Sequence, residues 1–132
     1  MKSYVIDSYA MIAYFEDEPG AELVSQILRE IRDKKAKGFM CVINWGEIYY
    51  NVMREVGEGK AKKVLEKLNS YSIEIVDADK RLTLEAARLK AKYRIAYADC
   101  FTAALGKLKK AEVITGDPEF RKLSKEIRVK WI

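Results

Sequence analysis

The residues of this sequence best suited to chemistry are acidic, because the 132-residue chain contains no histidine. The lack of histidine excludes His-based acid–base pairs, Ser-His-Asp and Cys-His nucleophile systems, and zinc sites with histidine ligands. The two cysteines, Cys41 and Cys100, lie among apolar neighbours and are expected to be buried free thiols. Any catalysis must therefore rest on carboxylates.

Two carboxylates follow short apolar runs that are typical of buried strands. The β-branched pair Val113-Ile114 is followed by a turn and then by Asp117, which stands where a helix begins with Pro118 in its first position. Near the amino terminus, Asp7 ends the similar run of residues 3–6. Open α/β sheets place their chemistry just beyond the carboxyl ends of the strands. We therefore expect both aspartates at such an edge, although each could also simply cap its helix.

Two further carboxylates are predicted to reach the same edge from helices. Glu47 lies one turn into the helix expected after the apolar run of residues 39–43, and Asp99 begins a helix in an otherwise apolar segment. Because parallel strands end at one edge of a sheet, we expect both side chains to join Asp7 and Asp117 in one crevice. Taken alone, Glu47 could equally be a solvated partner on its own helix, and Asp99 a charge at a helix N-terminus.

Four carboxylates brought this close would either hold protons or bind cations. Two carboxylates about 5 Å apart repel by roughly 3 kcal/mol at an effective dielectric constant of about 20. Mg²⁺ and Mn²⁺ take oxygen ligands and keep several waters, so either ion is a natural occupant. Such a metal can activate a water and hold a phosphate oxygen, which permits phosphodiester hydrolysis without histidine. Ser8, Asn44 and Thr115 lie beside predicted strand ends and could orient a carboxylate or a metal-bound water.

Alternating strand and helix patterns predict the sheet that would position these groups. Strands are expected at residues 3–6, 39–43, 72–76, 113–114 and 127–131. Helical patterns between them favour right-handed crossovers and an α/β fold, with a mainly parallel sheet of about five strands covered by helices on both faces. No linker, repeat or low-complexity segment interrupts the chain, so residues 1–132 are interpreted as one domain.

Two predictions concern helix ends. The helix that follows Gly20 is expected to end in the cationic residues 32–37, with Gly38 just beyond as the stop. Asn44 is expected to cap the helix that carries Glu47, since Asn is a preferred N-cap residue.

Composition narrows the setting in which this chemistry would act. Hydrophobic residues make up 49% and charged residues 34% of the chain, an ordinary mixture for a soluble globular protein. No apolar run approaches the roughly 18 residues of a membrane span, and Asp7 and Glu16 interrupt any signal-peptide pattern. We therefore expect a cytoplasmic protein without a membrane partner. The net charge of +5 permits a nucleic-acid or acidic-protein partner without requiring one.

Taken in order, the motifs resemble those of a PIN domain, and specifically the VapC-like ribonuclease toxins of type II toxin–antitoxin modules. The similarity spans essentially the whole chain. It is carried by Val5-Ile-Asp7-Ser8, Ile43-Asn-Trp-Gly-Glu47, Ala98-Asp99-Cys-Phe-Thr-Ala-Ala-Leu105 and Val113-Ile-Thr-Gly-Asp117-Pro-Glu-Phe120.

The resemblance implies a metal-dependent endoribonuclease. The implied metal-binding acids are three core residues, Asp7, Glu47 and Asp99, and a more variable fourth, Asp117. Ser8 and Thr115 match hydroxyl positions beside the first and last acids, while Asn44 stands where Ser or Thr is common. Members of this family bind Mg²⁺ or Mn²⁺ and activate water to cut RNA. They typically form homodimers and are held inactive by a co-expressed antitoxin protein.

Two other function classes stay open. A PIN fold with a silent site could serve as an RNA- or protein-binding scaffold, and metal titration would separate that class from a nuclease. A phosphoacceptor receiver domain is also a five-stranded α/β unit of similar length. It requires an acidic pair after the first strand, whereas Asp7 is followed here by Ser8 and Tyr9. The tyrosine also disfavours an Asp-x-Asp phosphatase.

Overall fold

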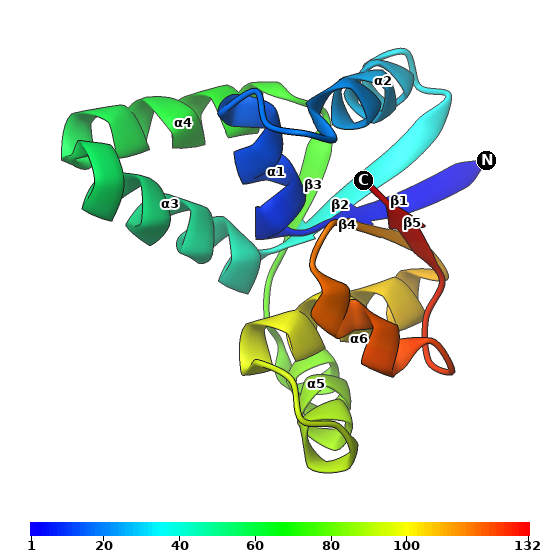
Figure 1. The fold of residues 1–132 in the computed structure, drawn as a ribbon. Helices are drawn as coiled ribbons and strands as arrows, with labels where there is room; N and C mark the ends of the chain where they lie inside the picture. Colours follow the sequence, from blue (N-terminus) through cyan, green and yellow to red (C-terminus); the bar gives the residue numbers. More distant parts are fainter.

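Five parallel strands form one sheet through the middle of the molecule in the computed structural model, which describes residues 1–132 (Figure 1). The strands are β1 (Lys2–Ile6), β2 (Ala36–Cys41), β3 (Ile73–Val76), β4 (Glu112–Thr115) and β5 (Val129–Trp131). Their order across the sheet is β3-β2-β1-β4-β5, and every neighbouring pair is parallel. The predicted α/β fold with a parallel five-stranded sheet is confirmed.

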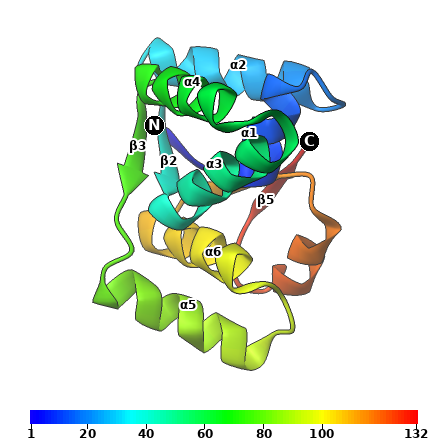
Figure 2. The ribbon, with the colours of Figure 1, turned by 90° about the vertical axis from the view of Figure 1, so that its left-hand side faces the viewer.

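Helices connect these strands and cover both faces of the sheet. On one face lie α1 (Ser8–Phe15), α2 (Ala21–Arg32), α3 (Val42–Val56) and α4 (Glu58–Ser70), and on the other lie α5 (Lys80–Lys92) and α6 (Tyr97–Lys109), as Figure 2 shows. A 3₁₀ helix, Pro118–Leu123, joins β4 to β5. None of the helices has the length and apolar character that a membrane crossing requires.

The strand order excludes one of the alternative function classes. Receiver domains have the doubly wound order 2-1-3-4-5, in which the first strand lies between the second and the third. Here β1 lies in the centre, between β2 and β4. The phosphoacceptor interpretation is therefore wrong.

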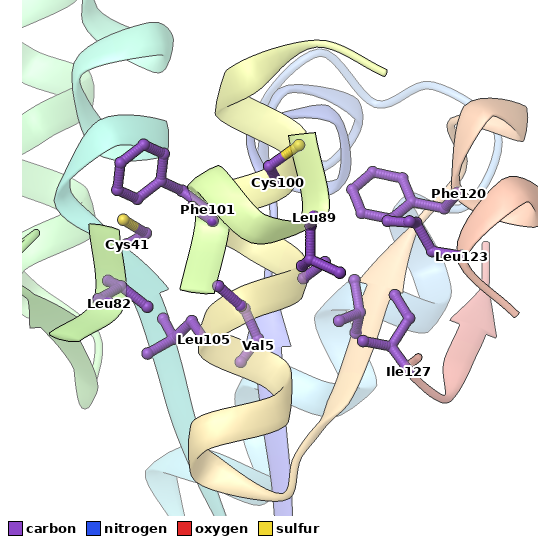
Figure 3. Close-up of a cluster of buried hydrophobic side chains, with 14 of the residues drawn as sticks. Val5, Cys41, Leu82, Leu89, Cys100, Phe101, Leu105, Phe120, Leu123 and Ile127 are labelled. Atoms are coloured by element: carbon purple, nitrogen blue, oxygen red, sulfur yellow. The ribbon is translucent and has the colours of Figure 1, made fainter. Parts of the chain in front are cut away.

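The core consists of two apolar clusters, one on each face of the sheet. Because successive strand residues point to opposite faces, Val5 joins the cluster under α5 and α6, whereas Tyr4 and Ile6 join the cluster under α1 and α2. Figure 3 shows the first cluster, in which both Cys41 and Cys100 are enclosed by apolar side chains. The two cysteines are buried free thiols, as predicted.

The second strand differs from its predicted extent. It begins at Ala36 and ends at Cys41, so Val42 and Ile43 belong to α3 and not to the strand. A short apolar run does not distinguish a buried strand from the buried first turn of a helix. Strand β4 is longer than predicted and includes Thr115, while β3 and β5 are slightly shorter.

Gly38 was expected to end the preceding helix, and that prediction is wrong. Helix α2 ends at Arg32, and Lys34 supplies the left-handed backbone conformation, with φ of 60°. Gly38 lies inside β2, where α2 packs closely on the sheet. A Cβ atom at this position would collide with Cδ1 of Ile31. The glycine is therefore needed for helix–strand packing and not for a turn.

Candidate active site

The four acids singled out in the sequence line one cleft of about 620 Å³ at the carboxyl edge of the sheet. Each comes from a different segment. Asp7 follows β1, Glu47 lies in α3, Asp99 lies in the first turn of α6, and Asp117 follows β4. Ser8 also lines this cleft.

Asp7 combines the helix cap and the cleft position that the sequence left as alternatives. Its side chain is 2% exposed, and its Oδ1 accepts a hydrogen bond of 2.8 Å from the Ala10 amide at the start of α1. Burial raises the pKa of Asp7 to about 7, and the charges of Asp99 and Asp117 act in the same direction. The Thr115 hydroxyl and the Ala10 amide oppose this rise in pKa.

Glu47 is held in place by two neighbours. Its Oε1 accepts hydrogen bonds from Ser8 Oγ at 3.0 Å and from Asn44 Nδ2 at 2.9 Å. Asn44 is fully buried, and its Oδ1 accepts a hydrogen bond of 2.8 Å from Thr102 Oγ1 on α6. A chain of hydrogen bonds from α6 to α3 therefore fixes the carboxylate.

The predicted capping role of Asn44 is wrong. Because α3 begins three residues earlier than expected, Cys41 occupies the N-cap position and offers no side-chain cap. Asn44 lies in the first turn, where its side chain reaches Glu47 three residues later on the same helix face. It therefore orients the acid instead of closing the helix.

Asp99 differs from Asp7 in that no hydrogen bond holds its carboxylate within the structure. The pKa of Asp99 is raised to about 7. Burial is the largest cause, and the negative charges of Asp117, Glu47 and Glu119 add to it in that order. The carboxylate stands at the N-terminal end of α6, where a helix favours negative charge. Burial and its acidic neighbours outweigh that helix effect.

Asp117 begins the 3₁₀ helix, with Pro118 in the first position as the sequence indicates. Its Oδ1 accepts a hydrogen bond of 2.9 Å from the Glu119 amide. Its own amide donates to Thr115 Oγ1 at 3.1 Å. Thr115 is fully buried behind the cleft and supports the turn that presents Asp117.

The cleft is strongly acidic. Glu16 and Glu18 bring the number of lining carboxylates to six, and no lysine or arginine lines it. The sequence interpretation missed these two glutamates, because neither follows a strand. Asn51, which lies one helical turn after Glu47, also lines the cleft.

The donor set fits a hard divalent cation. Asp7, Glu47 and Asp117 each accept their protein hydrogen bonds on one carboxylate oxygen. No three acidic or thiol side chains in the structure are close enough to enclose an ion by themselves. Mg²⁺ does not require such a cage, because it usually binds one or two carboxylates and keeps several waters.

Comparison with known proteins decides the family. The family model of the PIN domain matches residues 4–126. This chain belongs to the PIN domain family. A search of the curated proteins gave no significant match.

Solved PIN domain structures of the VapBC type share this fold. VapBC2 from Rickettsia felis, bound to a DNA fragment from its promoter, is 15% identical, with 97% of both chains covered and a TM-score of 0.77. DNA-bound VapBC from Salmonella typhimurium is 14% identical, with 98% of both chains covered and a TM-score of 0.77. Mycobacterium tuberculosis VapC20, a sarcin–ricin loop cleaving toxin, is 12% identical, with 91% of this chain and 93% of that chain covered and a TM-score of 0.71. The resemblance to VapC-like PIN domains is thus confirmed for family and fold.

Proposed function

We propose that this PIN domain is a Mg²⁺- or Mn²⁺-dependent endoribonuclease that hydrolyses RNA phosphodiester bonds, acting as the toxin of a VapBC-type module. The observation that carries the proposal is the cleft itself. Four separate segments deliver acids to a cleft that no cationic side chain lines. The similarity of its fold to VapC20, which cleaves the sarcin–ricin loop, supports RNA as the substrate.

In this proposal Asp7, Glu47 and Asp99 form the metal site with Asp117 as a fourth acid, and one or two of these carboxylates would bind the ion directly and the others through its waters. A divalent cation held there would act as a Lewis acid and provide a nucleophilic water. Ser8 and Asn44 hold one carboxylate oxygen of Glu47 by hydrogen bonds, so the other oxygen has a fixed orientation and is available to a cation.

The electrostatics of the cleft support the proposed role of a cation. RNA phosphates and the lining carboxylates carry the same charge, so the substrate backbone is repelled from the bare cleft. The pKa values of Asp7 and Asp99, each about 7, place both groups near half-ionisation at neutral pH. A bound cation favours their ionised forms, so its binding should release protons.

The proposal includes an antitoxin protein as a partner, a homodimer and a cytoplasmic location. Several similar structures are complexes of VapBC type. Helix α3 exposes Tyr50, Met53 and Val56 to between 43% and 56%, an apolar surface suited to a protein contact. The alternative is a PIN-fold scaffold that binds RNA or protein without catalysis. The orientation of Glu47 by three polar side chains favours the enzyme over that scaffold.

The deciding experiment is cleavage of a mixed RNA substrate by the purified protein with Mg²⁺ or Mn²⁺, and with chelator. The matched control is Asp7→Asn, because asparagine caps a helix as well as aspartate does but cannot supply the same charge. Metal-dependent cutting that is lost in the control supports the nuclease. Absence of cutting by wild-type protein free of a co-purified partner, as verified by mass spectrometry, supports the scaffold.

A further inference from the structure

We propose that Arg94, with Lys90 beside it, binds an RNA phosphate that flanks the bond to be cut. This inference rests on the proposed ribonuclease function and adds the contact by which the acidic cleft could retain a polyanion. It concerns the backbone of the substrate and not the identity of its bases.

The first observation is a second cleft that continues the acidic one. It has a volume of about 470 Å³ and shares Ala96, Asp99 and Asp117 with the acidic cleft. An RNA strand that lies across the four acids can therefore extend directly into this second cleft. Arg94 and Lys90 line it.

The second observation is the difference in charge between the two clefts. No cation lines the acidic cleft, so its walls repel a polyanion on every side. The continuation carries two cations beside Asp99, Asp117 and Glu119. Glu119 is already paired with Lys122 at 2.7 Å, which removes part of the negative charge that Arg94 would meet. A strand of RNA that leaves the acids in this direction gains attraction.

The third observation is that the guanidinium group of Arg94 is free, with no hydrogen bond or ion pair in the structure, and its side chain is exposed. Cations nearby are not free in this way. Arg88, Lys92 and Lys107 all contact Glu126. The structural pairing of this region is therefore complete without Arg94.

The fourth observation is that the backbone around Arg94 is fixed. Lys122 Nζ donates to the Arg94 carbonyl at 3.1 Å, and Lys90 Nζ donates to the Ile95 carbonyl at 2.6 Å. Ile95 itself is 4% exposed and packs in the core. A free side chain on an anchored segment loses less conformational freedom on binding than one on a mobile loop.

Guanidinium chemistry matches the ligand. Arginine presents a planar set of donors that binds phosphate with two parallel hydrogen bonds. A contact of this kind positions the backbone and contributes to the salt dependence of binding, without reading sequence.

The test compares wild type, Arg94→Ala, Arg94→Lys and Arg81→Ala in steady-state cleavage of a single-stranded RNA with Mg²⁺. Arg81 is the matched control, because it is an exposed, unpaired arginine on α5 that lines neither cleft. We expect Arg94→Ala to raise KM about tenfold with kcat within about twofold. Arg94→Lys should recover part of the loss, and Arg81→Ala should match wild type.

Binding measured separately distinguishes this inference from the proposed function. A fluorescently labelled phosphorothioate RNA, which keeps the backbone charge and resists hydrolysis, is titrated at a fixed Mg²⁺ concentration. The slope of log affinity against log salt should become shallower by about one in Arg94→Ala and stay unchanged in Arg81→Ala. Equal affinity and equal slope for Arg94→Ala and wild type would overturn the inference even if cleavage is observed. A wild type that binds RNA through Arg94 but does not cut it overturns the nuclease alone, and one that neither binds nor cuts overturns both.

Discussion

Helix α6 lies between two groups of acidic side chains with opposite surroundings. At its first turn, Asp99 faces the cleft, where six carboxylates and no cations form the lining. At its last turn, Lys107 Nζ contacts Glu126 Oε1 at 2.7 Å and Glu85 Oε1 at 2.9 Å. Glu126 also accepts hydrogen bonds from Arg88 and from the Tyr93 hydroxyl.

The pKa values of the two groups of carboxylates are shifted in opposite directions. Hydrogen bonds from Arg88 and Lys107 lower the pKa values of Glu85 and Glu126, respectively, to about 2. Burial raises the pKa values of Asp7 and Asp99 to about 7. Paired carboxylates therefore stabilise the fold, whereas the cleft carboxylates reduce its stability and keep their capacity for a cation.

The largest expected effect separates the two groups by activity. Asp99→Asn should lower the cleavage rate by about three orders of magnitude or more, because it removes a carboxylate from the proposed metal site. Glu126→Gln changes one oxygen in the paired group and should leave the cleavage rate within about twofold. Single-turnover cleavage of one RNA by both variants is the measurement. Equal losses of rate in the two variants would contradict the assignment of catalysis to the cleft carboxylates alone.

Added metal should stabilise the folded protein, and this stabilisation should depend on the cleft carboxylates and not on the paired group around Glu126. Mg²⁺ at about 100 times its dissociation constant should raise the free energy of unfolding by roughly 2.7 kcal/mol. Thermal unfolding at pH 8 with and without Mg²⁺ measures this effect. Asp99→Asn should lose most of the stabilisation and Glu126→Gln should retain it. A wild type that Mg²⁺ does not stabilise would argue for the scaffold.

Glu126→Gln should instead weaken the fold. The Glu126 side chain is 10% exposed and contacts Lys107, Arg88 and Lys92. Its neutralisation leaves Lys92 without a carboxylate partner and leaves Lys107 and Arg88 with Glu85 alone. We expect a loss of about 1–2 kcal/mol in the free energy of unfolding, since these cations remain partly solvated. Urea unfolding at pH 7 measures the loss, with Glu66→Gln on the exposed surface of α4 as the control.

The two groups also predict the shape of the stability profile with pH. Between about pH 4 and 7 the folded protein holds protons on Asp7 and Asp99 that the unfolded chain releases, so stability falls as the pH rises from about 4 to 7 and levels off above 7. The stability supplied by Glu85 and Glu126 is present above about pH 4.5 and is lost as pH falls toward 2. Unfolding in metal-free buffer should thus show maximal stability near pH 4, with a decline of about 2 kcal/mol or more by pH 8. The decline should be smaller in Asp99→Asn, and an unchanged decline would contradict the assignment.

The smallest expected effect tests the support of Glu47. Thr102→Val removes the hydroxyl that donates to Asn44 Oδ1 and leaves a buried acceptor without its partner. We expect a stability loss of about 1 kcal/mol and a cleavage rate about tenfold lower. Thr102→Ser keeps the hydroxyl and should preserve the cleavage rate, which distinguishes positioning from packing.

Local sequence patterns were sufficient for the parts of the site that depend on neighbouring residues. Asp7 and Asp117 begin their helices as predicted, because strand, turn and cap signals lie next to each other in the chain. Asn44 orients a carboxylate as predicted, but its capping role was wrong because the apolar run of residues 39–43 does not show that α3 begins at Val42. Its contact with Thr102 was not predicted, because it joins residues 58 positions apart.

The paired group around Glu126 shows the same limit. Its partners come from α5 and α6, and no local pattern specifies which lysine meets which glutamate. The continuation of the cleft toward Arg94 also depends on how the end of α5 lies against the segment after β4. These features are products of three-dimensional packing, which periodicity in the sequence does not encode.

The central place of β1 has a consequence for the newly synthesised chain. Strand β1 pairs with β2 on one side and with β4 on the other, so β1 leaves the ribosome well before one of its two partners is made. At 5–20 residues per second, that interval is on the order of ten seconds. Until β4 arrives, one edge of β1 is open to other strands and Asp117 is absent from the cleft. A chain in which the segment after β4 has not yet been made therefore has no complete set of acids, and the proposed activity begins only once Asp117 is in place.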